Sequence, residues 1–280
     1  MAKAVLTEYD YMIRQSIHHP VRIAQLSDIH SRRADDILAL LFASSPDLIV
    51  ITGDTLERYD NRPQYDYYKD DRFHPIKWLI IHTIHYVNYF LTFFAPQDKK
   101  SSTKYAYEIL SKISSAAPVY MSLGNHEQKL NEEDYAYIQK CGITLLDNAY
   151  ERVEINGFSF LLGGMSSWDF EDFYEDFKRQ KGFKILLCHH PERFEPLVQD
   201  SDIDLTLSGH THGGQVRIGK KGRGFFVPGQ GVFGRYAHGR FFDGRLIVSA
   251  GCANTVAFPR WFNPRELVVV NIKGDFDAGL

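Results

Sequence analysis

Five short motifs along the chain contain side chains that commonly bind metal ions. Imidazoles, carboxylates and an amide oxygen together suit Mn²⁺, Fe²⁺, Co²⁺ or Zn²⁺ better than the all-oxygen sites preferred by Mg²⁺. If one carboxylate is shared, the set suffices for two ions, and two ions about 3.5–4 Å apart can clamp a phosphate and activate water. We therefore predict a two-metal hydrolase of phosphorus–oxygen ester or anhydride bonds. The motifs are Asp28-Ile29-His30, Gly53-Asp54, Gly124-Asn125-His126-Glu127, His189-His190-Pro191 and Gly209-His210-Thr211-His212.

Each motif taken alone has a simpler interpretation. Asp-x-His is more often a surface turn with a capping aspartate, and Gly-Asp is a common turn signal. Asn125 could cap a helix, and a histidine before a proline more often lies in a loop than on a metal. The glycines around His210 and His212 are stronger evidence for a binding site, because they let the backbone approach a ligand closely. The combination is informative because each motif follows a short apolar run.

These apolar runs are typical of buried strands, and helix-like stretches such as 34–44 and 105–115 separate several of them. In open α/β sheets, ligands gather at the carboxyl ends of the strands. We therefore expect the five loops to converge on one site. The predicted strands are Val21–Leu26, Leu48–Thr52, 118–123, 184–187 and 204–207.

Antiparallel strands are predicted as well. Asn156-Gly157 suits the tight turn of a hairpin between 152–155 and 158–162. Asp243-Gly244 predicts a second hairpin between 241–242 and 245–249, and 266–272 reads as a last strand. The expected fold class is α/β: two mixed β-sheets packed as a sandwich and flanked by helices, in a single domain over residues 1–280.

The ordered motifs resemble those of the calcineurin-like metallophosphoesterases, whose pattern is D-x-H, G-D, G-N-H-D/E, H-x-P and G-H-x-H. The matches run from about residue 21 to 214, and Asn-Pro-Arg-Glu-Leu at 263–267 is similar to the small stand-alone bacterial branch. The resemblance implies the metallophosphoesterase fold and two divalent ions, of which we favour manganese. The nucleophile would be the water or hydroxide that bridges them. One ion would be held by Asp28, His30 and His212, the other by Asn125, His189 and His210, with Asp54 bridging both and His126 facing the leaving-group oxygen as electrostatic stabiliser or general acid.

Three details accompany this resemblance. The H-x-P spacing favours His189 as the ligand and leaves His190 beside the site or in solvent. Glu127 stands where many members have aspartate, which leaves the orientation of His126 open. Histidines 18, 19, 74, 82, 85 and 238 lie outside every motif and are expected to be structural or on the surface, with His82 and His85 near the substrate as the alternative.

Residues 56–104 form an insertion that a minimal strand–helix–strand crossover does not need, and we predict a cap or lid. Within it, 78–94 (WLIIHTIHYVNYFLTFF) contains no Asp, Glu, Lys or Arg. A single membrane span there would place Asp28 and Asp54 across the bilayer from the other ligands, so we reject it. The helical apolar segment either packs on the domain or lies in a membrane surface, where the flanking lysines 77, 99, 100 and 104 could meet anionic headgroups.

Composition narrows the remaining choices. The net charge of −3 gives no general attraction to nucleic acid, although a local basic patch stays open. Cys141, Cys188 and Cys252 are far apart, and the N-terminus shows no secretory apolar region. We expect a cytoplasmic protein, or one associated peripherally with a membrane.

The leading functional hypothesis is a phosphodiesterase or pyrophosphatase acting on an organic, lipid-linked substrate, similar to the UDP-2,3-diacylglucosamine pyrophosphatases; the apolar insertion motivates that comparison. Alternatives are a general phosphodiesterase without lipid specificity and a phosphomonoesterase or protein phosphatase, which Gly-Asp-Thr-Leu-Glu-Arg at 53–58 resembles faintly. A scaffold without metals is disfavoured by the complete ligand set. A nuclease is disfavoured by the acidic charge balance.

Overall fold

The computed structural model of the chain describes residues 3–17, 19–58, 83, 101–218, 223–256 and 259–274. Most of the predicted insertion at 56–104 lies outside these ranges, including all of 78–94 except Thr83, lysines 77, 99 and 100, and His74, His82 and His85. His18 lies outside them as well. The cap and the single-domain organisation therefore stay predictions. Within the described ranges, no helix combines the length and apolar character needed to cross a bilayer.

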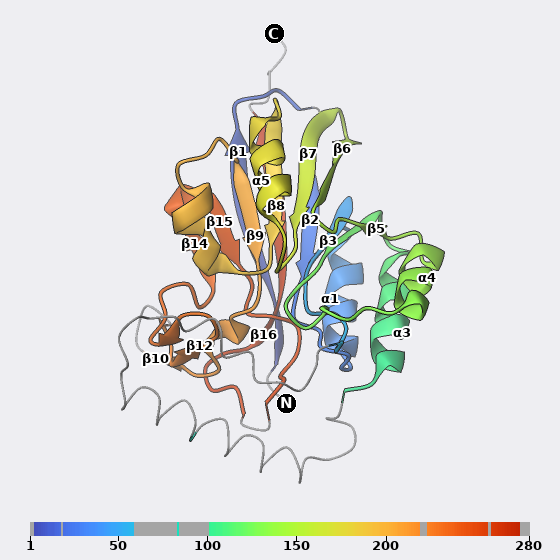
Figure 1. Cartoon of the computed structure of the whole chain (residues 1–280), viewed down its shortest axis with the longest axis vertical. Helices are drawn as coiled ribbons and strands as arrows, with labels where there is room; N and C mark the ends of the chain where they lie inside the picture. The colour runs from blue at the N-terminus through green and yellow to red at the C-terminus, as the bar shows by residue number, and fades with distance from the viewer. Residues whose placement is uncertain are drawn as a thin grey trace.

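Two six-stranded sheets form the centre of the molecule (Figure 1). Both are mixed: β2 pairs antiparallel with β16 and β6 with β7, whereas β2–β3–β4 and β7–β8–β9 are parallel. The first sheet has the order β1 (Ala4–Ile13), β16 (Arg265–Gly274), β2 (Val21–Leu26), β3 (Leu48–Thr52), β4 (Val119–Ser122) and β5 (Thr144–Leu145). The second has the order β14 (Gly239–Phe241), β15 (Leu246–Val248), β9 (Leu205–Ser208), β8 (Phe183–Cys188), β7 (Phe158–Met165) and β6 (Ala149–Ile155).

The alternation of side chains along the strands explains why the sheets pack face to face. Ile23 and Val50 of the first sheet share one buried cluster with Phe160, Leu162 and Ile185 of the second. Their strand neighbours point to the opposite faces, because successive side chains of a strand alternate in direction. Each sheet therefore has a second apolar face that helices must cover, and the predicted α/β sandwich is confirmed.

Helices cover both outer faces of this sandwich (Figure 1). Ile37 and Ile109 pack in the cluster that contains Ile49 of the first sheet, while Phe177 packs with Leu186 of the second. The predicted helices at 34–44 and 105–115 differ from the observed ones by one or two residues. The helices are α1 (Asp35–Ser44), α3 (Thr103–Ile113), α4 (Glu132–Lys140) and α5 (Glu171–Arg179).

The two predicted hairpins have different outcomes. Asn156 and Gly157 both have positive φ, 53° and 79°, and connect β6 to β7 as predicted. The second hairpin exists, but the two-residue turn at Asp243-Gly244 is wrong, because β14 ends at Phe241 and a 3-10 turn over Phe242–Gly244 intervenes. Within that turn Phe242 stacks on Phe194, with ring centroids 4.5 Å apart.

The long strand β1 was not predicted. It pairs parallel with β16 along ten residues at the edge of the first sheet. Its residues alternate between partly buried and exposed, so charged side chains such as Glu8 and Asp10 interrupt every apolar run. The polar composition of an edge strand therefore concealed it.

Phe160 tests the packing between the sheets, because its side chain is fully buried there. Phe160→Ala should lower the free energy of unfolding by about 3–5 kcal/mol, since it leaves a cavity in a close-packed core. Urea denaturation measures the change, with Phe42→Ala on the 45% exposed side chain of α1 as the control. Equal effects of the two substitutions would contradict the assigned core.

Candidate metal centre

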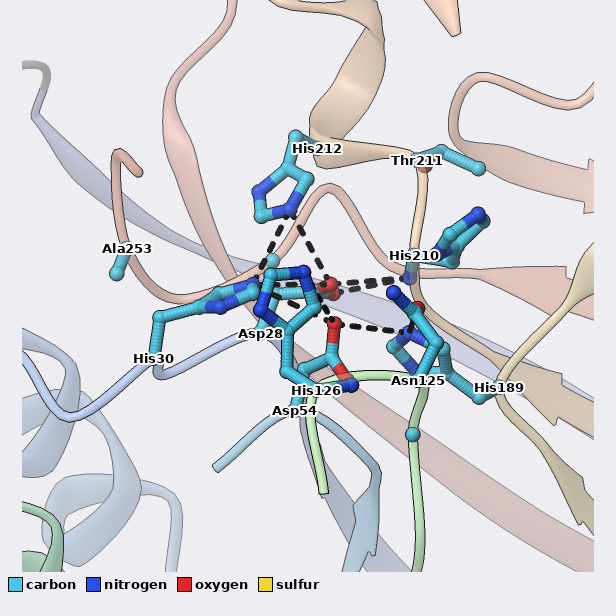
Figure 2. Close-up of polar contacts among 12 residues, drawn as sticks. Asp28, His30, Asp54, Asn125, His126, His189, His210, Thr211, His212 and Ala253 are labelled. Atoms are coloured by element: carbon cyan, nitrogen blue, oxygen red, sulfur yellow. Dashed lines mark hydrogen bonds and ion pairs between the residues drawn. The ribbon is translucent and has the colours of Figure 1, made fainter. Parts of the chain in front are cut away.

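The seven predicted metal ligands meet where the loops after β2, β3, β4, β8 and β9 converge (Figure 2). The carboxylates of Asp28 and Asp54 lie at the centre of the view, with imidazoles on either side. These two residues are 0% and 1% exposed. A buried carboxylate is costly unless positive charge and hydrogen bonds compensate it. The centre is therefore built to attract cations.

Backbone hydrogen bonds fasten the loops after β2 and β3 to each other. The amide of Asp28 donates to the carbonyl of Gly53 (3.1 Å), and that of His30 donates to the carbonyl of Asp54 (2.8 Å). Asp28, His30 and Asp54 all have positive φ, of 54°, 51° and 57°. Such conformations cost a non-glycine residue roughly 1–3 kcal/mol and persist where the surroundings hold them, often at functional sites.

Asp28, His30 and His212 form the first group of facing ligand atoms. His212 Nε2 lies 3.5 Å from Asp28 Oδ1 and 3.2 Å from His30 Nε2, which in turn lies 3.8 Å from Asp28 Oδ1. One ligand atom from each residue falls within 4.8 Å of the other two. Two imidazole nitrogens and a carboxylate oxygen that face one another match the donor set of a single divalent cation.

Asp54, His189 and His210 form the second group, again with their ligand atoms within 4.8 Å of one another. Asn125 extends it, because His189 Nε2 lies 3.1 Å from both Asn125 Oδ1 and Asp54 Oδ2. The rings of His189 and His210 have centroids 5.0 Å apart. This group supplies imidazole, carboxylate and amide donors, a mixture that suits a borderline first-row ion.

The hydrogen bonds of His189 show that a cation fits here. Its Nδ1 lies 2.7 Å from the carbonyl of Thr52, an acceptor only, so Nδ1 carries a proton. In the neutral ring, Nε2 then presents a lone pair to two oxygens that are themselves acceptors. Three electron-rich atoms at this separation require a positive charge between them, either a proton on Nε2 or a metal ion. The residues therefore fit the metal that the donor set implies.

Asp54 connects the two groups. Its Oδ2 lies 3.1 Å from His189 Nε2 and 3.6 Å from His30 Nε2. Its Oδ1 accepts a hydrogen bond of 2.9 Å from the amide of His126. One carboxylate oxygen thus faces both ligand groups, while the backbone holds the other.

Glu57, for which the sequence predicted no role, connects His30 and His126 through hydrogen bonds to both imidazoles. Its Oε1 lies 2.7 Å from His30 Nδ1, and its Oε2 lies 2.9 Å from His126 Nδ1. The two imidazoles pack edge to face with centroids 4.6 Å apart. His126 is 27% exposed, and its Nε2 lies 3.9 Å from Asp54 Oδ2. Glu57 therefore turns the Nε2 atoms of a predicted ligand and of the predicted acid toward the site.

The electrostatics of this pair follow from burial and proximity. Burial would raise the pKa of Glu57, but the charge of His30 and the hydrogen bonds from both imidazoles outweigh it and lower the pKa to about 2. Burial would lower the pKa of His30, but Glu57 and Asp28 together raise it to about 10. In the metal-free protein, Glu57 therefore carries a negative charge that favours a cation beside it.

Glu127 organises the loops and does not set the orientation of His126, the question that the sequence left open. Its fully buried carboxylate accepts backbone hydrogen bonds from Gly124 (2.8 Å), Asp54 (3.0 Å), Thr55 (2.8 Å) and Leu56 (3.1 Å). Burial and the nearby charge of Asp54 raise the pKa of Glu127 to about 7. The residue fastens the loop after β4 to the loop that carries Asp54.

The glycines of the motifs are needed for close approach. A Cβ on Gly124 would overlap Asp54 Oδ1, and a Cβ on Gly53 would lie 2.6 Å from Gly124 Cα. A Cβ on Gly209 would lie 2.7 Å from Asp28 Oδ2. Any larger residue at these positions would displace the central aspartates, which explains why glycine precedes Asp54, Asn125 and His210.

His190 is not in solvent but buried at 1% exposure. Its Nε2 lies 2.9 Å from Ser167 Oγ, and its Nδ1 lies 3.2 Å from Glu192 Oε1. Its ring packs against that of His210, tilted by 59° with centroids 4.4 Å apart, so it supports a predicted ligand. Among the other histidines, His19 is exposed and His238 is partly buried, far from these groups in sequence.

Two residues just before the C-terminal strand, Arg260 and Asn263, also contact the site, and the sequence analysis did not predict a role for either of them. Asn263 Nδ2 donates to the carbonyl of His212 (2.7 Å). Arg260 donates to the carbonyls of Ala250 and Ala253 and lies 3.4 Å from His212 Nδ1. Asn263 is the first residue of the Asn-Pro-Arg-Glu-Leu segment, whose resemblance to the family is described above, and it is the residue of that segment that contacts His212.

Comparison with known proteins gives a consistent result. The sequence model described as calcineurin-like phosphoesterase matches residues 21–214. The chain is 26% identical over 209 residues to the uncharacterized protein YpbG of Bacillus subtilis (72% of this chain, 65% of that protein). It is 27% identical over 273 residues to metallophosphoesterase Cj0846 of Campylobacter jejuni (91% and 59%), and 24% identical over 233 residues to phosphodiesterase YaeI of Escherichia coli (77% and 72%). The match thus spans less than two thirds of the length of YpbG and Cj0846.

Glu57→Gln tests the role of the bridging carboxylate. The amide keeps the shape but loses the charge and one acceptor, so metal affinity should fall by about 10–100-fold, the usual cost of removing a partner of a ligating histidine. Isothermal titration with Mn²⁺ measures the change. Glu108→Gln, at an exposed carboxylate of α3, is the matched control and should bind as the wild type does. An unaltered affinity in Glu57→Gln would remove this role.

The buried histidines predict how pH affects the metal-free protein. Burial opposes charge on both His30 and His189, but neighbouring carboxylates raise their pKa values to about 10 and about 9. The contribution of these two histidines to the stability of the folded protein is therefore complete below pH 6.5 and is lost as the pH rises through those values. Burial lowers the pKa of His212 to about 3 and also lowers those of His190 and His210, so their contribution falls as pH drops below 6.5.

The melting temperature of chelator-treated protein should therefore be highest near pH 6.5 and decrease on both sides. Manganese should flatten the alkaline side, because a bound cation replaces the proton between the ligands. Thermal unfolding measured from about pH 5 to about pH 9, once in chelator and once in Mn²⁺, checks both expectations. A metal-free melting temperature that keeps rising above pH 6.5 would contradict the assignment.

Proposed function

Because the chain belongs to the calcineurin-like phosphoesterase family, whose sequence model matches residues 21–214, we propose that it is a metal-dependent phosphodiesterase with a two-cation centre. The observation that carries the proposal is the pair of ligand groups joined by Asp54. Asp28, His30 and His212 would hold one cation, and Asn125, His189 and His210 the other, with Asp54 shared. Two divalent cations there, with manganese our preferred ion, would supply hydroxide at neutral pH and neutralise the charge of the phosphate.

The protein's own residues have separate tasks in this reaction. Asp54 and Asp28, both buried, fix the position of positive charge, so that the phosphate oxygens have one favoured orientation. His126 stands at the exposed side of the centre with Nδ1 held by Glu57. Its Nε2 then faces the centre, 3.9 Å from Asp54 Oδ2, where a proton can pass to the oxygen of the departing group.

The hydrogen bonds of Arg58 favour a phosphodiester over a phosphomonoester as the substrate. A phosphate monoester carries an additional negative charge that a nearby guanidinium would bind well. The guanidinium of Arg58 is instead held by Asp134 through hydrogen bonds of 2.7 and 2.8 Å, and it also donates to Thr103 Oγ1. It joins its loop to α4 and α3, so this guanidinium is not available to bind the additional charge of a monoester, which favours the diester.

Two chromogenic substrates test the reaction. The manganese-loaded protein should hydrolyse bis-p-nitrophenyl phosphate with a higher kcat/KM than p-nitrophenyl phosphate. A preference for the monoester would support the phosphatase alternative, and no turnover of either substrate by a fully loaded protein would end the proposal.

A finer proposal concerns the substrate. The apolar sequence at 78–94 supports a lipid-linked phosphodiester or pyrophosphate such as UDP-2,3-diacylglucosamine, met at a membrane surface. Release of UMP from that compound is the direct assay. If only water-soluble diesters are cleaved, the enzyme is a general phosphodiesterase without lipid specificity.

His126→Ala tests the proton donor. The variant should keep the metal content of the wild type, because His126 is not among the seven residues that would hold the two cations, and should lose roughly 10²–10⁴-fold in kcat, the usual contribution of a general acid. Elemental analysis and turnover of bis-p-nitrophenyl phosphate measure the two quantities. His19→Ala, at an exposed histidine outside the centre, is the control. Full activity in His126→Ala would assign the proton to another group.

A further inference from the structure

A strip of aromatic side chains borders the candidate metal centre. Phe233, Trp261 and Phe262 are 50%, 54% and 87% exposed. Large apolar side chains exposed together usually mark a surface that binds something. The metal-site proposal makes no use of these residues, so they need an explanation of their own.

Backbone pairing places the segments that carry the aromatic residues next to one another. Val216 forms a parallel bridge with Trp261, and the amide of Phe225 donates to the carbonyl of Val216 (2.7 Å). The amide of Phe233 donates in turn to the carbonyl of Phe225 (3.0 Å), and the two rings pack edge to face at 5.7 Å. Paired segments lie about 4.8 Å apart. The exposed aromatic side chains on these neighbouring segments are Phe233, Trp261 and Phe262, and we call them the aromatic strip.

The strip is attached directly to the metal centre. Val216 lies four residues after His212, and Asn263, next to Phe262, donates to the carbonyl of His212. Four short strands follow His212: β10 (Arg217–Ile218) pairs with β11 (Arg223–Gly224), and β12 (Phe226–Val227) pairs with β13 (Gly231–Val232). In Figure 1, β10 and β12 lie next to each other at the lower left. Whatever the strip binds is therefore held beside the proposed catalytic site.

The charge of the sequence that carries Phe225 and Phe233 favours an anionic partner. The sequence at 216–235 contains five basic residues and no acidic one, in a chain whose net charge is −3. Of those that the structure describes, Arg217 is partly buried, and Arg235 is 67% exposed with Nη1 2.6 Å from Glu195 Oε1. Arg223 is exposed on β11. Exposed Trp and Phe beside basic residues are the combination that binds the interface of an anionic bilayer, where the rings enter the headgroup region and the cations meet lipid phosphates.

We propose that the aromatic strip docks this protein onto an anionic lipid surface, with the metal centre facing that surface. The inference rests on the proposed function for its purpose, because it would present the headgroup phosphates of a lipid-linked substrate to the site. It does not require the apolar segment at 78–94. Nucleic acid, which also binds basic and aromatic surfaces, is the competing partner that the experiment must separate.

Vesicle binding tests the proposal with the full-length, manganese-loaded protein. Sedimentation with vesicles of equal parts phosphatidylcholine and phosphatidylglycerol should capture the wild type, and vesicles of phosphatidylcholine alone should capture much less. The double variant Phe262→Ser with Phe233→Ser should bind at least about tenfold more weakly, since two apolar anchors are lost. The matched control, Phe42→Ser with Met12→Ser, removes two exposed apolar side chains elsewhere and should bind as the wild type does.

Tryptophan fluorescence separates the strip from the insertion. On adding the anionic vesicles, the emission of the Trp78→Phe variant should shift to shorter wavelength, and that of Trp261→Phe should not. The proposal is overturned if the double variant binds vesicles as the wild type does, if Trp261→Phe keeps the whole shift, or if a single-stranded oligonucleotide binds while the vesicles do not. Hydrolysis of bis-p-nitrophenyl phosphate in solution should stay unchanged in the double variant, so loss of docking and failure of the proposed chemistry give different results.

Discussion

The structure depends on one electrostatic constraint: the carboxylate of Asp54 is buried among imidazoles and can be stable only with positive charge beside it. Asp28 lies in the same interior, and Glu57 adds a third carboxylate behind His30. Protons on the histidines satisfy this requirement in the metal-free protein. A divalent cation can replace them with better geometry, because the facing donors include nitrogens whose other ring atom already donates to an acceptor, as in His189.

The surrounding fold exists to hold these groups in place. The parallel strands of both sheets deliver their loops to the same region, and backbone hydrogen bonds fasten the loop of Asp28 to that of Asp54. Gly124 permits a contact that any side chain would block, and the carboxylate of Glu127 gathers amides from two loops. This packing holds Asp28, His30 and Asp54 in their strained backbone conformations. Because the sandwich is rigid, the ligand atoms stay at fixed distances from one another.

The sequence predicted the sandwich and the convergence of seven side chains, because strand ends and metal-capable residues repeat together along the chain. It could not show residues whose role depends on three-dimensional proximity. Glu57 touches His30 and His126 across large sequence separations, and Asn263 reaches His212 from the C-terminal strand. The edge strand β1 was hidden by its alternating polar residues, and the aromatic strip is assembled from segments that show no common pattern.

Electron paramagnetic resonance on manganese-reconstituted protein, with the metal content of the same sample measured by elemental analysis, shows whether two cations share the carboxylate of Asp54. We expect two manganese ions per chain with an exchange-coupled spectrum, since ions that share one carboxylate lie about 3.5–4 Å apart. A single ion per chain with the simple spectrum of isolated Mn²⁺, or two ions without coupling, would contradict the shared position of Asp54.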